Sequence, residues 1–256
     1  MNMKELIKYI LISLIQGFTE PLPISSSGHM LITKNLLNIE SNDLSLEILL
    51  NFSSMLAIFI FMFTKRLSIK ETIFDLSLIK KVIIASIPTI IIGFFVKSYI
   101  ENTTQSISFI GFSLLVTTVL LMLSFYYINK ANKQDINSFN ALSLGFSQSI
   151  ALVPGISRMG TVMTCGLISG INIKKVLDFS FLMYLIVSSG SFVLEIPNLI
   201  NINHTYILYY AISFIVTFIT TFFSIKWFYN IISSKSLIAF SLYTLTLGIL
   251  LIIIGN

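Results

Sequence analysis

Two polar loops inside hydrophobic sequence contain the residues whose side chains could take part in catalysis or ligand binding. They share the skeleton Gln-x7-Ile-Ser-x-x-Gly, and every position of the second copy follows its counterpart in the first at the same distance along the chain. The first copy consists of Gln16, Ile24, Ser25 and Gly28, and the second of Gln148, Ile156, Ser157 and Gly160. The repetition predicts that the chain arose by internal duplication.

Ionisable side chains accompany both loops: Glu20 and His29 the first, Arg158 the second. Such groups are costly to bury in lipid and seldom lie there without a role. Arg158 offers a planar fork of donors that stays protonated and fits two oxygens of a phosphate. Further donors are the hydroxyls of Ser25, Ser26, Ser27 and Ser157 and loop amides such as that of Gly160. Because phosphoryl transfer depends mainly on positioning and charge stabilisation, this set of residues indicates phosphate chemistry.

The first loop also offers a proton-transfer group and metal ligands. His29 is the only histidine near either loop, and histidine acts as base, acid or nucleophile. Glu20 is a hard oxygen ligand, and Gln16 lies one helical turn before it. The sequence therefore predicts that Gln16 and Glu20 hold a divalent cation, Mg²⁺ or Ca²⁺, beside the phosphates.

Composition places both loops in a membrane protein. Hydrophobic residues make up 55% and charged residues 11% of the 256 residues, and the mean hydropathy is +0.91. Such a chain cannot cover a soluble globule with polar surface. The single Cys165 excludes an intramolecular disulfide.

Six apolar runs have the length of transmembrane helices, about 17 to 25 residues. They cover residues 44–64, 82–98, 107–128, 176–196, 205–225 and 237–254. The segments 9–36 and 141–171 are interrupted by the polar loops, and we expect each to be a re-entrant helical hairpin. The predicted fold is an all-α integral membrane protein with six transmembrane helices and two re-entrant helical hairpins.

Positive charges predict the topology. The segment 65–81 holds Lys65, Arg66, Lys70, Lys80 and Lys81, which the positive-inside rule places in the cytoplasm. Lys174 and Lys175 are then also inside only if residues 141–171 enter from the cytoplasm and return to it. By the same logic residues 9–36 dip in from the outside. The resulting count is 11 basic residues inside and four outside (Lys4, Lys8, Lys34 and Lys97), with Arg158 within the membrane and His204 in an outer loop.

Each half of the single membrane domain, residues 1–256, consists of a hairpin followed by three spans. Repeat one covers residues 1–128 and repeat two residues 141–256. Because three spans are an odd number, the second half begins on the opposite side of the membrane and is inverted relative to the first. Many transporters have this arrangement, with broken helices that meet near the midplane of the bilayer. Irregular backbone is tolerated at that depth only inside protein or beside a water-filled cavity. The helix that restarts after each loop aims free N–H groups at the centre, where they favour anions.

The two loops resemble the signatures of a known family. Gln16-Gly-Phe-Thr-Glu20 followed by Pro23-Ile-Ser-Ser-Ser-Gly-His29 is similar to the first signature of the bacterial undecaprenyl-diphosphate phosphatases, and Pro154-Gly-Ile-Ser-Arg158-Met-Gly160 to the second. Leu56-Ala57 and Asp178-Phe-Ser-Phe181 extend the similarity over most of the chain. The resemblance implies an enzyme of the bacterial cytoplasmic membrane that dephosphorylates undecaprenyl diphosphate to undecaprenyl phosphate. That reaction recycles the lipid carrier for peptidoglycan and other cell-wall polymers, and loss of the family confers bacitracin sensitivity.

The resemblance also implies roles for single residues. It places Gln16 and Glu20 near the metal and the diphosphate, Ser27 and His29 at the chemistry, and Ser157 and Arg158 on the phosphates. We therefore expect Glu20, Ser27, His29 and Arg158 to be catalytic, at a site open to the extracytoplasmic side. The expected partners are a polyprenyl diphosphate and membrane lipids, and no nucleic acid.

The chain departs from the family pattern at a few positions. Met159 and Val162 stand where the family usually has serine and threonine, and Gln16 is a variant of the family's first glutamate. Asn51 and Ser53 replace a more usual glutamine and glycine. The expected catalytic residues are unchanged, which predicts a divergent, active member.

Each assignment has an alternative. Arg158 is also explained as a snorkelling residue, His29 as a packing or capping residue, and Ser25 and Ser26 as groups that only satisfy loop backbone. Gln148 is expected to hold the hairpins together. For the whole protein, the alternatives to an enzyme are a transporter or flippase of a lipid phosphate or another anion, and a non-catalytic lipid-phosphate binder.

Overall fold

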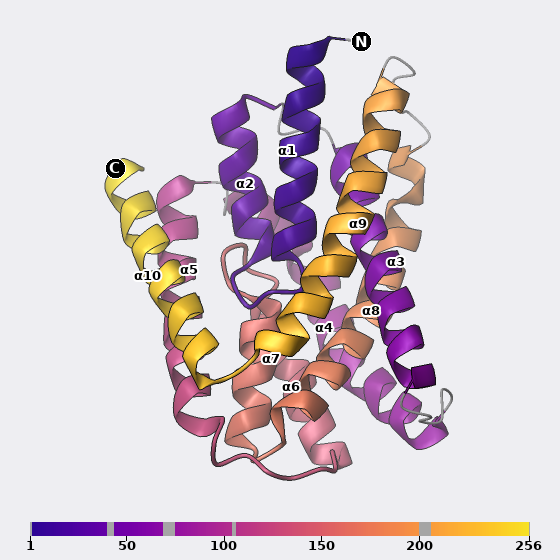
Figure 1. The fold of residues 1–256 in the computed structure, drawn as a ribbon, viewed down its shortest axis with the longest axis vertical. Coiled ribbons are helices and arrows are strands. Elements are labelled where there is room, and N and C mark those ends of the chain that lie inside the picture. The colour runs from indigo at the N-terminus through magenta and orange to yellow at the C-terminus, as the bar shows by residue number, and fades with distance from the viewer. Residues whose placement is uncertain (1, 40–43, 69–74, 104–105, 200–205, 256) are drawn as a thin grey trace.

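The computed structural model describes residues 2–39, 44–68, 75–103, 106–199 and 206–255. These residues form ten helices and no strand, which confirms the predicted all-α fold (Figure 1). The helices are α1 (Met3–Thr19), α2 (Ser26–Leu37), α3 (Leu44–Ser68), α4 (Leu76–Thr103), α5 (Ile107–Tyr127), α6 (Ser138–Ile150), α7 (Arg158–Ile168), α8 (Ile173–Leu199), α9 (Ile207–Ile231) and α10 (Ser234–Ile254).

Six of these helices are long and apolar enough to cross a membrane: α3, α4, α5, α8, α9 and α10. Each coincides with one predicted span. The helices run past the apolar segments, however, and α4 begins at Leu76 rather than near residue 82. Its first turns include Lys80 and Lys81, whose long side chains let a helix continue into the headgroup region.

The other four helices form two hairpins, α1–α2 and α6–α7. Figure 1 shows the hairpins entering the bundle from opposite ends, with their connecting loops near its middle. The loops contain the prolines that end a helix, Pro21 and Pro23 in the first and Pro154 in the second. This arrangement is consistent with the predicted re-entrant segments 9–36 and 141–171.

Equivalent helices of the two halves make equivalent contacts with the other half. Helix α1 packs against α9, and its counterpart α6 packs against α4. Helices α3 and α8 also contact each other, as do α5 and α10. Each hairpin is therefore held by the middle span of the other half, as expected of an inverted duplication.

Hydroxyl groups join α9 to α1. Ser213, Thr217 and Ser224 donate to the carbonyls of Tyr9, Ser13 and Phe18 at 3.4, 3.2 and 2.7 Å. On the other side, Thr89 of α4 donates to the carbonyl of Gly145 of α6 at 3.1 Å. Small and hydroxyl-bearing residues are the usual contacts between membrane helices, since lipid removes the hydrophobic drive for association.

Glycines allow these backbones to approach closely. A Cβ at Gly145 would lie 2.0 Å from the carbonyl oxygen of Ala85 in α4. A Cβ at Gly17 would lie 2.8 Å from the carbonyl oxygen of Thr217 in α9. No side chain larger than hydrogen fits at Gly145 without displacing α6.

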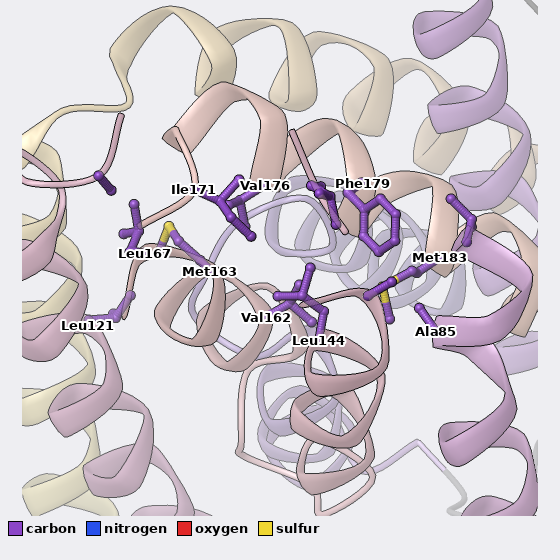
Figure 2. Packing of buried hydrophobic residues seen from close by; sticks show 14 of the residues in the cluster. Ala85, Leu121, Leu144, Val162, Met163, Leu167, Ile171, Val176, Phe179 and Met183 are labelled. Carbon is purple, nitrogen blue, oxygen red and sulfur yellow. The ribbon is translucent and has the colours of Figure 1, made fainter. Parts of the chain in front are cut away.

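Helix α7 lies in a buried apolar cluster that fixes the second hairpin (Figure 2). The cluster draws on six helices: Ala85 of α4, Leu121 of α5, Leu144 of α6, Val162, Met163 and Leu167 of α7, Val176, Phe179 and Met183 of α8, and Leu237 of α10. Burial of this many side chains orients α7, and with it the Arg158 at its first position.

Basic residues gather at the end of the bundle opposite both termini. Lys65 near the end of α3 forms an ion pair with Asp178 of α8. Lys133, between α5 and α6, pairs through its backbone with Gly170 and Asn172 at the start of α8. Figure 1 places the connection between α5 and α6 at the end opposite the labelled N and C ends. The side chains of Arg66 and Lys97, and residues Lys70 and His204, lie outside the described part of the chain.

Candidate functional site

The two loops touch at their tips. A Cβ at Gly28 would lie 3.2 Å from the Cα of Gly155, and a Cβ at Gly160 would lie 3.8 Å from the carbonyl oxygen of Pro23. The constant offset between the repeats relates Pro23 to Gly155 and Gly28 to Gly160. The two contacts are therefore equivalent under the exchange of halves, and the duplicated loops meet across a pseudo-twofold axis.

The repeated Ser-x-x-Gly pattern is a helix cap. Ser25 accepts a hydrogen bond from the Gly28 amide at 3.3 Å and caps the N-terminus of α2, and Ser157 accepts one from the Gly160 amide at 3.0 Å and caps the N-terminus of α7. Serine at this position satisfies amides that the first turn of a helix leaves free. The predicted restart of a helix after each loop is confirmed.

A cavity of about 330 Å³ lies beside the loop contact. Polar side chains from both halves line it: Glu20, Ser25, Ser26, Ser27 and Asn51 from the first, and Gln148, Arg158, Tyr184, Ser188, Ser191 and Glu195 from the second. Thr89 and several apolar residues complete the wall. We call this cavity the central pocket. Its size and its mixture of polar and apolar walls are typical of a small-molecule or headgroup site.

Arg158 and Glu20 form the ionic centre of the pocket. Arg158 Nη2 donates to Glu20 Oε1 at 3.1 Å, and Gln16 Nε2 donates to Glu20 Oε2 at 3.1 Å. The same Gln16 nitrogen donates to Asn51 Oδ1 at 2.9 Å. The guanidinium carbon of Arg158 lies 4.1 Å from the ring centre of Tyr184. A cation stacked on an aromatic ring and bonded to a carboxylate is held in one orientation.

The N-termini of α2 and α7 add partial positive charge at the pocket. Ser26 and Ser27 lie in the first turn of α2, and Arg158 begins α7. The first amides of a helix and the aligned peptide dipoles favour an anion at that end. Ser25 has a φ of 69°, a conformation that L-residues rarely adopt and that occurs mainly at functional sites.

Four predicted residues do not line the central pocket: Gln16, whose amide nitrogen donates to Glu20, and Ser157, Gly160 and His29. Ser157 is buried, its hydroxyl caps α7, and its amide donates to Thr117 Oγ1 at 3.0 Å, while Gly160 gives its amide to Ser157. His29 faces a second, mostly apolar cavity of about 640 Å³ between α1, α2 and α10. Its Nδ1 lies 2.8 Å from the Ser25 carbonyl oxygen and its Nε2 2.7 Å from the Tyr243 hydroxyl. The structure thus separates the histidine ring from the arginine and the glutamate.

Two of the departures from the family pattern, Met159 and Val162, do not line the central pocket, whereas a third, Asn51, does. Met159 is 1% exposed in an apolar cluster with Leu177, Phe181 and Phe228, and Val162 is fully buried in the cluster around α7. The nearby Thr161 donates to the carbonyl of its own helix at Arg158. The departures at Met159 and Val162 are therefore packing changes behind the site.

Of the two predicted cation ligands, Gln16 and Glu20, only Glu20 lines the central pocket. No group of three or more His, Cys, Asp or Glu side chains able to hold a metal ion occurs among the described residues. Glu20 supplies one carboxylate and Asn51 an amide oxygen, whereas Gln16 directs its Nε2, a hydrogen-bond donor, at both of them. Mg²⁺ is commonly held by one or two carboxylates together with substrate phosphates, so these residues fit a hard cation that arrives with a phosphate ligand.

Sequence reasoning missed the contribution of α8. Tyr184, Ser188, Ser191 and Glu195 line the pocket at intervals of three to four residues, which places them on one face of the helix. This polar stripe in an otherwise apolar span was the available signal. A partly buried glutamate at the end of a membrane helix, Glu195, was a second.

Comparison with known proteins gives a consistent result. Residues 9–250 match the family described as "Bacitracin resistance protein BacA". Undecaprenyl-diphosphatase 1 of Bacillus cereus is 35% identical over 264 residues, covering 96% of this chain and 97% of that protein. Undecaprenyl-diphosphatase of Oceanobacillus iheyensis is 33% identical, covering 98% of each chain. Undecaprenyl-diphosphatase 1 of Halalkalibacterium halodurans is 34% identical, covering 96% of this chain and 95% of that protein.

Proposed function

The chain belongs to the family of the bacitracin resistance protein BacA, and from this premise we propose that it removes the terminal phosphate of undecaprenyl diphosphate in the central pocket. It dephosphorylates undecaprenyl diphosphate to undecaprenyl phosphate, the activity that the names of its relatives state. The reaction regenerates the lipid carrier for cell-wall polymers, in a multi-pass membrane protein with six candidate spans.

The observation that carries the site assignment is the pair of Arg158 and Glu20 in a pocket between two helix N-termini. Arg158 Nη1 is buried and has no hydrogen-bond partner among the described residues. A bound diphosphate supplies acceptor oxygens for this nitrogen. Its oxygens also accept hydrogen bonds from the amides at the start of α2. The prenyl chain is apolar and extends among the lipids.

Ser27 is the proposed nucleophile. It is exposed, lines the central pocket, and lies in the first turn of α2. Its Oγ attacks the terminal phosphorus, the bond to the bridging oxygen breaks, and undecaprenyl phosphate departs. The serine proton passes to an oxygen of the transferred phosphoryl group. Water then cleaves the phosphoserine and releases inorganic phosphate. A loose phosphoryl-transfer transition state needs little proton abstraction, so positioning and charge are the main requirements.

Arg158 and His29 have different parts in this scheme. Arg158 stabilises the charge on the phosphoryl oxygens, and Tyr184 keeps its guanidinium flat against the pocket wall. His29 binds the Ser25 carbonyl from behind the loop, which makes it a positioning residue for the serines. Ser157 and Gly160 serve the same end by capping α7.

Glu20, with Gln16 and Asn51, would hold Mg²⁺ or Ca²⁺ next to the diphosphate. The cation supplies Lewis-acid stabilisation of phosphate charge when bound. In its absence Glu20 balances the charge of Arg158 through the hydrogen bond described above.

The central pocket opens away from the lysine-rich end of the bundle. Its lining on α8 runs from Tyr184 to Glu195, toward the end of that helix, while Lys174 and Lys175 lie at the start. Its lining on α3 is at Ile48, Asn51 and Phe52, whereas Lys65 lies near the other end. Under the positive-inside rule the mouth of the pocket is extracytoplasmic.

Phosphate release from undecaprenyl diphosphate by the purified full chain in detergent tests the assignment. We expect release with Mg²⁺ or Ca²⁺, loss with chelator, and loss in Arg158→Ala. Binding of the lipid without release of phosphate would contradict the assignment and favour the non-catalytic binder. Lipid movement across vesicles without hydrolysis would favour the transporter.

A further inference from the structure

Gln148 of α6 lines the central pocket, yet its amide makes no hydrogen bond to the described residues. The residue is 2% exposed, and both Oε1 and Nε2 are buried without a partner in that part of the chain. Buried polar groups are almost always hydrogen-bonded, and leaving one unpaired costs about 1 to 3 kcal/mol. An unpaired amide in the wall of a polar pocket indicates a ligand that pairs with it.

Gln148 has a counterpart at which the same amide is used internally. Gln16 is the equivalent residue of the first half, and its Nε2 donates to Glu20 and Asn51. Glu20 is four residues after Gln16, whereas Leu152 is four residues after Gln148. The second half therefore keeps the glutamine of the duplication but has lost the carboxylate partner that the first half provides.

The hairpin contact itself does not need Gln148. Ser149 Oγ donates to the Gly145 carbonyl at 3.1 Å and to Thr89 Oγ1 at 3.4 Å, and Thr89 donates to the same carbonyl. The two bonds of Thr89 and the close approach of Gly145 to Ala85 hold α6 on α4. The expectation that Gln148 holds the hairpins together thus has no hydrogen bond to support it.

We propose that Gln148 is a substrate-binding residue whose Nε2 donates to a phosphate oxygen of the bound diphosphate. Arg158 Nη1 and the Tyr184 hydroxyl are the other donors of this pocket wall that have no partner among the described residues, and all three come from the second half of the chain. The first half supplies the carboxylate and the serines. The ligand class is the diphosphate of a lipid, so this assignment rests on the proposed function.

Gln148→Leu separates binding from packing. It removes two unpaired polar atoms and keeps a similar volume, so the melting temperature of the full chain in detergent should stay the same or rise. Losing one charge-assisted hydrogen bond to phosphate should lower kcat/KM for undecaprenyl diphosphate by about 10- to 100-fold. An unchanged kcat/KM for the folded protein would overturn the assignment, whatever the melting temperature does.

Ser180→Ala is the matched control. The Ser180 hydroxyl is equally buried and also has no partner among the described residues, but it does not line the central pocket. We expect its kcat/KM to match that of the unmodified chain. An equal loss in both variants would mean that relief of any unpaired group disturbs the site, which would overturn a specific role for Gln148.

Inorganic pyrophosphate distinguishes a failure of this inference from a failure of the proposed function. A ligand that binds the folded state raises its melting temperature. We expect pyrophosphate to raise that of the unmodified chain and of Ser180→Ala, and to have a smaller effect on Gln148→Leu. If the unmodified chain releases no phosphate but shows this difference, the phosphatase fails and Gln148 stands. An equal shift in all three proteins, or no shift in any of them, overturns the role of Gln148.

Discussion

Arg158 Nη2 lies 3.1 Å from Glu20 Oε1, and this ion pair joins residues that are 138 positions apart in the chain. Glu20 ends α1 of the first hairpin, and Arg158 begins α7 of the second. Both side chains are largely buried, at 8% and 18% exposed. Removing one member of such a pair leaves the other charged and unpaired, which is more costly than the pair itself is favourable. A bound diphosphate competes with Glu20 for hydrogen bonds from Arg158. A cation beside Glu20 would then neutralise the negative charge of its carboxylate.

Arg158→Lys tests the requirement for a planar fork of donors. Lysine keeps the positive charge beside Glu20 but loses bidentate geometry and the stack on Tyr184. We expect kcat for phosphate release to fall by about 100- to 1,000-fold while the protein remains folded. Lys8→Ala, which removes a half-buried lysine paired with Glu5 far from the pocket, should leave the rate unchanged. A rate for Arg158→Lys within a few-fold of the unmodified chain would show that charge alone suffices.

Ser27→Ala and His29→Gln separate the two candidate nucleophiles. Because Ser27 lines the central pocket and His29 does not, we expect Ser27→Ala to abolish turnover. His29→Gln retains a side-chain group able to bond the Ser25 carbonyl, so its loss in kcat should be partial, about 10-fold or less. Rapid-quench trapping of phosphoprotein provides the direct measurement. Complete loss in His29→Gln, with phosphoprotein still formed by Ser27→Ala, would assign the nucleophile to the histidine.

Glu20→Gln tests the cation site. The variant removes the only carboxylate in the chain of bonds from Gln16 to Arg158, so the Mg²⁺ or Ca²⁺ concentration for half-maximal phosphate release should rise by at least about tenfold. Glu5→Gln, at a partly exposed position near the N-terminus, should leave the metal dependence unchanged. Full activity of the unmodified chain in excess chelator would rule out the predicted cofactor.

Met159→Ser introduces the family's usual residue. Because Met159 is 1% exposed and packs against Phe181 and Phe228, serine leaves a cavity and an unpaired hydroxyl, and we expect a loss of about 2 to 4 kcal/mol in stability. The rate per folded molecule should not increase. Thermal unfolding and initial rates on the same preparation measure both quantities. A gain in kcat would mean that position 159 acts at the chemistry.

Gly145→Ala tests the close contact between α6 and α4. The added Cβ would lie 2.0 Å from the Ala85 carbonyl oxygen, so the helices must separate and the yield of folded protein should fall sharply. Gly190→Ala in α8 is the matched control, because nothing lies within 4 Å of its Cβ position. Replacing a helical glycine without steric conflict should stabilise the protein by about 0.5 to 1 kcal/mol. Equal yields of the two variants would contradict the contact.

Much of the fold was predictable because membrane helices obey simple rules. Length and apolar composition identified six spans, each of which coincides with a long helix. Prolines and capping serines identified the loops, and the constant offset between Gln16 and Gln148 and between Ser25 and Ser157 related one loop to the other. The ends of the helices were less predictable, because hydropathy marks the residues in the lipid core and not where the backbone hydrogen bonding of a helix ends. Helix α4 therefore begins at Leu76, before its apolar run.

The site was predictable in part. Of the residues that the sequence singled out, Glu20, Ser25, Ser26, Ser27 and Arg158 line one pocket. The sequence also grouped His29 with them, because the histidine follows Ser27 by only two residues, and this grouping was wrong for the central pocket. On a helix, residues two apart point in different directions, and α2 therefore sends Ser27 to the central pocket and His29 to the cavity beside Tyr243.

The sequence by itself determined the membrane class, the number of spans, the duplicated loops and the residue types that suit phosphate chemistry, since these follow from composition and local pattern. Only the tertiary structure decided which of those residues share a pocket. It paired Arg158 with Glu20, placed the stripe from Tyr184 to Glu195 in the same pocket as Ser25, Ser26 and Ser27, and left Gln148 unpaired among the described residues where Gln16 is bonded. Those relationships depend on how two inverted halves pack across an axis, and no local pattern records that packing.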